Sequence, residues 1–202
     1  MIAMRYFSRF CLLLISLSLA PLVQAETQVE SKSNAKTQPQ VDMRTSMGTI
    51  TITLFPEKAP VTVANFLEYV DAGFYDNTVF HRVVPNFVIQ GGGFTSNMRP
   101  RKTRAPIVNE SDNGLANRRG TLSMARTSHP DSATSQFFIN LENNPSLNAS
   151  FNKAGYAVFA KVTEGLPVID MISRVPTGRV QRYQDVPLDP VIILSMRRKS
   201  DS

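Results

Sequence analysis

The chain has little of the residues that most often carry metal binding or nucleophilic catalysis. Its 202 residues include one cysteine, two histidines and no tryptophan. A single cysteine, Cys11, cannot form a disulfide framework or a cysteine-based zinc site. His81 and His129 have no second ligand at metal spacing, so we predict that the protein binds no metal and needs no cofactor.

Two familiar catalytic motifs are also absent. Gly91-Gly92-Gly93 follows an apolar run, but no Gly-Lys-Ser or Gly-Lys-Thr comes after it, which argues against a phosphate-binding loop. No Gly-x-Ser-x-Gly elbow is present, and His81 lies within an apolar segment, so we interpret it as a packed core histidine. The glycine triplet instead lets the backbone turn sharply and approach a ligand.

Long apolar runs are confined to the first 25 residues. Arg5 and Arg9 precede the apolar stretch from Cys11 to Ala20, which at about ten residues is too short to span a bilayer. Val23-Gln24-Ala25 fits the small-x-small cleavage pattern. We predict a signal peptide over residues 1–25 and a periplasmic protein. An uncleaved anchor and secretion beyond the periplasm are the alternatives.

The rest of the chain divides into a polar segment and one domain. Residues 26–41 contain no aromatic residue and few apolar ones, which predicts a flexible tether. Residues 42–199 are long enough for a single domain with a real core. Loss of the signal peptide takes the net charge from +6 to +4, because Arg5 and Arg9 leave without an acidic residue.

The positive charge clusters in two places only. These are the segment Arg99–Arg104 and the tail Arg197–Lys199. No aromatic residues interleave with the first cluster, so we interpret it as a solvated loop and predict no nucleic-acid binding. No apolar run after residue 25 approaches the length of a membrane span, so we predict no stable membrane insertion after cleavage.

Hydrophobic periodicity predicts a mainly β domain. Alternation or short apolar runs indicate strands over residues 47–55, 78–84, 87–90, 120–125, 136–140, 156–162 and 191–196. Helical spacing indicates helices over 62–70, capped by Thr62 and closed by Gly73, and over 166–175. A closed antiparallel barrel with a helix over each open end accounts for this pattern.

The segment from Phe80 to Gly93 is the most informative part of the chain. It places Arg82 and Gln90 among Val, Ile and Phe residues, and a permanent cation is costly to bury there unless it is used. The run Thr134–Asn140 adds more apolar and amide side chains. Together they predict an apolar pocket with a guanidinium and amides at its rim. Such a pocket suits an uncharged, partly apolar ligand that needs one well-placed hydrogen-bond donor.

Four ordered motifs carry a resemblance to a known family. They are Phe80-His81-Arg82-Val83-Val84-Pro85-x-Phe87-x-x-Gln90-Gly91-Gly92, Gly120-x-Leu122-Ser123-Met124-Ala125, Ser135-Gln136-Phe137-Phe138-Ile139 and Tyr156-x-Val158-Phe159-x-Lys161-Val162. In order and spacing the chain resembles the cyclophilins, the peptidyl-prolyl cis–trans isomerases, from about Asp42 to Met196. Ala125-Arg126-Thr127 and Asp131–Gln136 look most like the bacterial periplasmic branch.

The resemblance implies a fold and a set of site residues. The fold is a closed eight-stranded antiparallel β-barrel capped by two α-helices, with the site on its outer face. The implied catalytic residues are Arg82, Gln90 and Phe87, with Gln90 orienting Arg82. The implied substrate-binding residues are Val88, Ala125, Arg126, Thr127, Gln136, Phe138, Leu147 and Tyr156. Ser146 stands where the family often has Trp or Phe, which implies weak inhibition by cyclosporin.

The implied function is acceleration of rotation about Xaa-Pro bonds during folding of exported proteins. Arg82 would stabilise the twisted transition state while the apolar pocket holds the proline. The implied partners are proline-containing unfolded or flexible polypeptides, and the implied oligomeric state is a monomer. A second hypothesis stays open: the domain acts mainly as a proline-directed peptide-binding module or holdase chaperone, and isomerisation is incidental.

Overall fold

The structure is a computed structural model that describes residues 38–200. The predicted signal peptide and most of the predicted tether lie outside the described residues. The predicted start of the domain at Asp42 is two residues too late, because strand β1 (Gln40–Thr45) already begins inside the predicted tether. Val41 and Met43 of this strand are fully buried, and β1 pairs with strands on both sides. Within the described part of the chain, no helix is long and apolar enough to cross a membrane.

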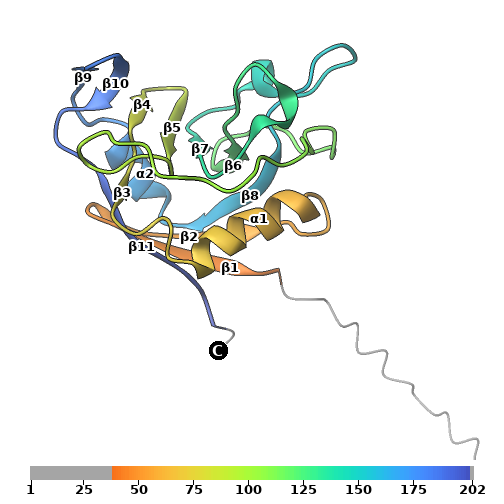
Figure 1. Cartoon of the computed structure of the whole chain (residues 1–202), viewed down its shortest axis with the longest axis horizontal. Helices are drawn as coiled ribbons and strands as arrows, with labels where there is room; N and C mark the ends of the chain where they lie inside the picture. Colours follow the sequence, from red (N-terminus) through yellow and green to blue (C-terminus); the bar gives the residue numbers. More distant parts are fainter. Residues whose placement is uncertain (1–37, 201–202) are drawn as a thin grey trace, which may run out of the picture. The chain divides into compact units, whose positions relative to one another are not determined.

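A single antiparallel sheet of nine strands forms the body of the domain (Figure 1). After β1 come β2 (Gly48–Leu54), β3 (Thr78–Val79), β4 (Arg82–Val84), β5 (Val88–Gly91), β6 (Thr121–Met124), β7 (Phe137–Asn140), β8 (Val158–Glu164) and β11 (Ile192–Arg198). Their order in the sheet is β3-β11-β1-β2-β8-β6-β7-β5-β4. The predicted mainly β fold is therefore confirmed.

The predicted closed ring of eight strands is wrong in detail. The segment predicted as one strand over 78–84 is interrupted at Phe80 and His81, and its halves β3 and β4 form the two opposite edges of the sheet. β3 pairs with β11, whereas β4 pairs with β5. The sheet is curled, and its two edges are joined by the chain itself at Phe80–His81. This junction places Arg82 on an edge strand rather than in the middle of the sheet.

Helix α1 (Pro60–Asp71) begins two residues before the predicted start. Thr62 does not cap it; the Glu110 carboxylate accepts hydrogen bonds from the backbone amides of Val61 (3.0 Å) and Thr62 (2.8 Å) and from the Thr62 hydroxyl (2.6 Å). A carboxylate suits this position because it meets unpaired amides at the positive end of the helix. Gly73 follows the last turn with φ 62°, as predicted.

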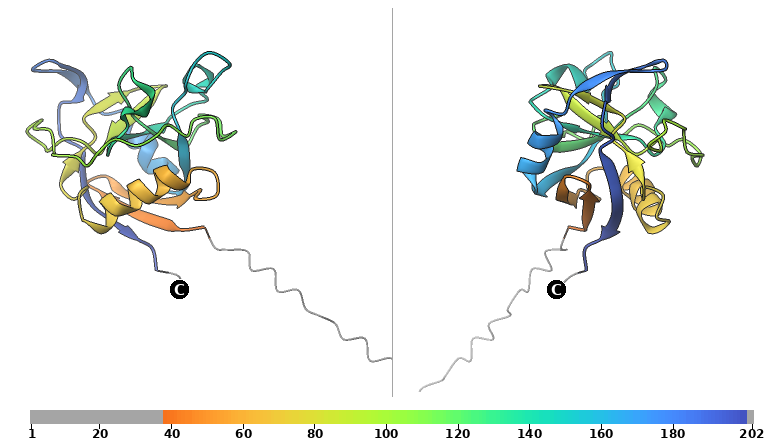
Figure 2. Two further views of the ribbon diagram at one scale, coloured as in Figure 1. Left: turned by 45° about the vertical axis from the view of Figure 1, so that its right-hand side comes forward. Right: turned by 90° about the vertical axis from the view of Figure 1, so that its left-hand side faces the viewer.

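Helix α2 (Leu166–Ile172) is shorter than predicted and begins after Gly165, whose φ is 89°. α1 packs on β11 and α2 packs on β2. The two views of Figure 2 show the helices on opposite sides of the curled sheet. The core between α1 and the sheet is rich in aromatic rings: Phe66 lies 5.0 Å from Phe159 and 5.4 Å from Tyr75 between ring centroids. Such pairs add to the stability gained from burial alone.

A small second sheet was not predicted. Strands β9 (Thr177–Val180) and β10 (Tyr183–Pro187) form an antiparallel hairpin, which packs against β4. The Tyr183 ring lies 5.2 Å from Phe94, and Phe94 lies 4.6 Å from His81. The hairpin therefore covers the strand that carries Arg82.

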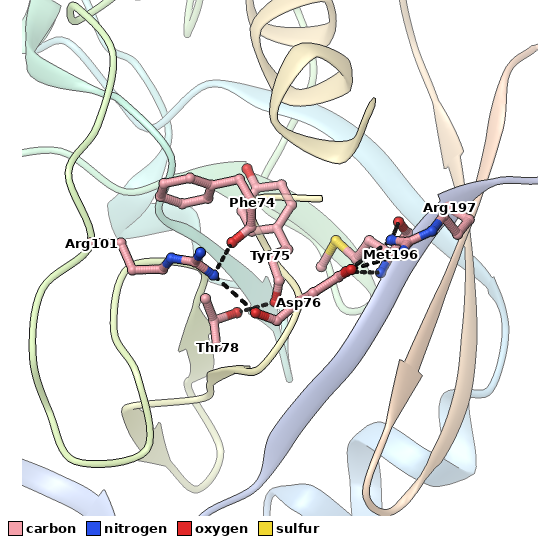
Figure 3. Close-up of polar contacts among 7 residues, drawn as sticks. All are labelled: Phe74, Tyr75, Asp76, Thr78, Arg101, Met196 and Arg197. Atoms are coloured by element: carbon pink, nitrogen blue, oxygen red, sulfur yellow. Dashed lines mark hydrogen bonds and ion pairs between the residues drawn. The ribbon is translucent and has the colours of Figure 1, made fainter. Parts of the chain in front are cut away.

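The turn between α1 and β3 is held from two directions (Figure 3). Arg101 donates to the carbonyls of Phe74 (2.7 Å) and Asp76 (2.9 Å). The Asp76 carboxylate accepts from Arg197 (2.8 and 2.6 Å), and the hydrogen bond from that guanidinium lowers the pKa of Asp76. Because this turn leads directly into β3, these contacts also fix the path of the chain towards Arg82.

The side chains of the two basic clusters make more contacts within the fold than the sequence indicated. In the segment Arg99–Arg104, which was predicted to be a solvated loop, Arg101 holds the turn just described and Arg104 pairs with Glu68. In the tail, the three cations pair with carboxylates: Arg197 with Asp76, Arg198 with Asp71 and Lys199 with Glu164. The tail is therefore not a free cationic patch.

Candidate active site

The hairpin of β4 and β5 brings Arg82 and Gln90 together. The two residues are register partners across the hairpin, as are Val84 and Val88. Asn86 in the turn has φ 57°, a left-handed conformation that asparagine tolerates better than most residues. The Arg82 side chain is 37% exposed, so its guanidinium is accessible but partly shielded from water.

Strand β7 supplies the next layer of the site. Phe138 is the register partner of Gln90, so the two lie side by side across β5 and β7. The Phe138 ring is 4% exposed and meets the Tyr156 ring edge-on at 5.5 Å. A cavity of about 120 Å³ opens here. It is lined by Arg82, Phe87, Val88, Gln90, Ala125, Arg126, Phe138, Leu147 and Tyr156.

A second cavity of about 280 Å³ adjoins the first. The two share Gln90, Ala125 and Arg126 in their walls. The second is lined in addition by Thr127, Ser132, Thr134 and Gln136. The structure thus brings all the predicted site residues to these two adjoining cavities. Ser132 and Thr134 were missed as site residues; their place beside Gln136 in the sequence was the signal available.

The predicted contact between Gln90 and Arg82 is not the one observed. The Gln90 side-chain amide donates to the Gln136 side-chain oxygen at 3.0 Å. Arg82 instead has the Asp185 carboxylate 3.6 Å from its Nε, and among residues 38–200 it makes no side-chain hydrogen bond. Asp185 lies on β10, about a hundred residues away, so no local pattern could have pointed to it.

Arg126 ties the edge after β6 to the loop between residues 146 and 156. Its guanidinium donates to the carbonyls of Gly155 (3.1 Å), Ala154 (2.6 Å) and Thr127 (2.9 Å). It also stacks over the Tyr156 ring, with Cζ 4.7 Å from the ring centroid. Because three carbonyls and a ring hold this cation, Arg126 forms a rigid part of the wall between the two cavities.

His81 is a packed core histidine, as predicted. It is 6% exposed, and its Nδ1 has no hydrogen-bond partner among the described residues. Burial, and secondarily the positive charge of Arg82, lower the pKa of His81 to about 4. The imidazole is therefore neutral near pH 7 and carries no charge into the neighbouring site.

The first cavity combines an aromatic and aliphatic wall with a guanidinium at its rim. No hydroxyl or thiol nucleophile paired with a histidine lines it. The part of the chain that the structure describes also contains no cluster of three or more His, Cys, Asp or Glu residues able to hold a metal ion. The arrangement can bind an apolar ring and place a hydrogen-bond donor beside it.

Comparison with known proteins gives a consistent result. The family model for cyclophilin type peptidyl-prolyl cis-trans isomerases matches residues 40–198. A peptidyl-prolyl cis-trans isomerase of Acinetobacter baylyi is 55% identical over 168 residues, which are 83% of this chain and 89% of that protein. Peptidyl-prolyl cis-trans isomerase A of Dickeya dadantii is 53% identical over 81% of this chain and 86% of that protein.

A solved structure agrees in fold. The crystal structure of a Cryptosporidium parvum cyclophilin type isomerase, determined in the presence of the dipeptide Ala-Pro, superposes with a TM-score of 0.67 at 30% identity. The superposed region covers 80% of this chain and 99% of the Cryptosporidium parvum chain. The chain therefore belongs to the cyclophilin-type peptidyl-prolyl cis–trans isomerase family.

Proposed function

We propose that this protein accelerates cis–trans rotation about Xaa-Pro bonds in exported polypeptides, with Arg82 as the group that stabilises the transition state. The observation that carries the proposal is the position of Arg82 at the rim of the cavity walled by Phe87, Phe138 and Leu147. A proline ring bound against that wall would have its nitrogen next to the guanidinium.

The chemistry requires no covalent intermediate. The barrier to rotation, roughly 20 kcal/mol, comes from amide resonance. In the twisted state this resonance is lost and the proline nitrogen becomes pyramidal and basic. A donor aimed at that nitrogen binds the twisted state more tightly than the planar one, and this difference lowers the barrier. Arg82 suits this role because it is always protonated and has a rigid set of donors.

The second cavity can hold one part of the substrate while another part rotates. Thr127, Ser132 and Gln136 give it polar walls, whereas the first cavity also has the aromatic and aliphatic wall of Phe87, Phe138 and Leu147. The proline ring is held in the first cavity and the neighbouring residue in the second. Fixing one flank allows rotation of the bond between them to proceed without release of the peptide.

The proposed setting is the periplasm, with unfolded or flexible proline-containing chains as clients. The support is the sequence of residues 1–25, with its basic start, short apolar run and small-x-small end. N-terminal sequencing of the protein from a periplasmic extract would test this. The expected first residue is Glu26; an N-terminus at Met1 in the membrane fraction would contradict it.

The central test compares Arg82→Ala with wild type in a cis-to-trans assay on a Xaa-Pro peptide. We expect kcat/KM to fall by a factor equivalent to about 2–4 kcal/mol, as for other lost transition-state donors. Arg99→Ala is the matched control, because Arg99 is exposed and lines neither cavity. Near-wild-type turnover by folded Arg82→Ala would refute the role. If turnover falls but cellular function and client affinity persist, the peptide-binding role is the main one.

A further inference from the structure

Phe151 is the most exposed large apolar residue in the described chain. Its relative exposure is 101%, whereas the other exposed large apolar residues lie between 40% and 62%. A single exposed apolar side chain is common on protein surfaces and by itself means little. Phe151 is unusual for where it lies and for how firmly its loop is held.

The loop that carries Phe151 has a closed and rigid base. Ser150 and Lys153 exchange two backbone hydrogen bonds of 2.9 and 3.0 Å, which leaves Phe151 and Asn152 at the tip. The Lys153 ammonium donates to the Ser146 carbonyl at 2.7 Å. At Gly155 the two arms touch so closely that an added Cβ would lie 2.3 Å from the backbone nitrogen of Ala149. These contacts hold the backbone that carries Phe151 in a defined position relative to the two arms of the loop.

Both arms of the loop come from the wall of the first cavity. Leu147 and Tyr156 line that cavity, and the Tyr156 amide donates to the Leu147 carbonyl at 2.9 Å. Phe151 is four residues beyond Leu147, so its backbone lies within about 14 Å of the cavity wall. Figures 1 and 2 show this loop, in cyan, projecting beyond the neighbouring strands.

The fold itself makes no use of this ring. Phe151 belongs neither to the hydrophobic core nor to any aromatic pair or cation–π contact among the described residues. An aromatic side chain has few rotatable bonds, so it offers a large contact area with little loss of entropy on binding. An exposed ring on a held backbone next to this cavity has the properties of an anchor for a bound chain.

We propose that Phe151 is an accessory contact for client chains, and that it binds an apolar side chain within about four residues of the proline held in the first cavity. The proposal rests on the proposed isomerase function and specifies the clients further. Extended chain advances about 3.3–3.6 Å per residue, so a separation of at most about 14 Å is spanned by at most about four residues. Unfolded polypeptides meet this requirement, because they expose apolar residues that folded proteins bury.

The test uses pairs of twelve-residue peptides, each with one proline. In one pair, leucine or glycine occupies the second, third and fourth positions before the proline; in the other, leucine or glycine occupies the second, third and fourth positions after it. The readout is the ratio of the glycine-peptide KM to the leucine-peptide KM. In wild type we expect this ratio to reach about fivefold to thirtyfold in one pair, the effect of one well-placed interface side chain. That pair identifies the flank that passes the loop.

Phe151→Ser is then expected to bring that ratio close to one. The ring has no packing partner to lose, so the variant is expected to fold normally. Met171→Gln is the matched control: Met171 is 48% exposed on α2 and lines neither cavity. It should keep the wild-type ratio.

Three outcomes overturn the inference. One is isomerisation of all peptides with no leucine preference in either pair; another is a preference that survives in Phe151→Ser. The third is a wild-type dimer in solution that dissociates in Phe151→Ser, since the ring would then bind a second copy of the chain. Isomerisation of no peptide at all would instead contradict the proposed function.

Discussion

Acidification is expected to destabilise the protein through one buried histidine. His81 lies between β3 and β4, packed against Phe94, and its Nδ1 has no hydrogen-bond partner among residues 38–200. Its pKa falls from 6.5 to about 4, first because of burial and second because of the charge of Arg82. The unfolded chain therefore binds a proton on His81 more readily than the folded protein does.

The sign and size of the change in stability follow from this difference in proton binding. Between pH 6.5 and pH 4 the unfolded state carries more protons on this residue, so stability is lost as the pH falls through that window. The full difference is equivalent to about 3 kcal/mol, of which about 2 kcal/mol is lost between pH 7 and pH 4.5. Asp71 and Asp76, whose pKa values are lowered from 3.8 by Arg198 and Arg197, act only at lower pH.

Urea unfolding at pH 7 and pH 4.5 measures this loss. His81→Leu removes the titrating group. Between the two pH values, its free energy of unfolding is expected to fall by about 2 kcal/mol less than that of wild type. His129→Gln is the control, because His129 is the only other histidine and is exposed. If the free energy of unfolding has the same pH dependence in wild type and in His81→Leu, then the pKa of His81 does not differ between the folded and unfolded states.

Further perturbations test other parts of the structure. Glu110→Gln weakens the cap of α1 and should cost about 1 kcal/mol in urea unfolding, whereas exposed Glu57→Gln should not. Gly155→Ala forces the arms of the Phe151 loop apart, so we expect at least about 1–3 kcal/mol of destabilisation and a raised KM. Asp185→Asn should change the free energy of unfolding by less than about 1 kcal/mol, because more than a third of each side chain in this ion pair is exposed to water. Cyclosporin should inhibit the isomerase weakly, since Ser146 replaces the usual aromatic residue; strong inhibition would contradict this.

The sequence was sufficient for the features that depend on neighbouring residues. Alternation of apolar and polar residues identified β2, and helical spacing identified the apolar face of α1. The segment from Phe80 to Gly93 predicted an apolar pocket with a guanidinium at its rim, and the structure contains such a pocket. These features were accessible because side-chain periodicity and local turn residues encode them directly.

Features that depend on distant segments were missed or misjudged. β1 was not predicted as a strand, and its first two residues were assigned to the polar tether, because only Val41 and Met43 mark it and its burial depends on β2 and β11. The cap of α1 was assigned to Thr62, which is local, whereas the observed cap is Glu110. The strand breaks at Phe80–His81 because β3 and β4 lie at opposite edges of the sheet, where β3 pairs with β11 and β4 pairs with β5.

The division between the two sources of information is clearest at Arg82. The sequence alone determined that a permanent cation lies among apolar residues in a segment that ends in three glycines, because these are properties of consecutive residues. Only the tertiary structure decided that the Asp185 carboxylate stands beside that cation and that Gln90 bonds to Gln136 instead. It also decided that Phe151 projects beside the cavity. The physical reason is that such pairings arise when the sheet curls and distant loops close over it, and no local pattern records that event.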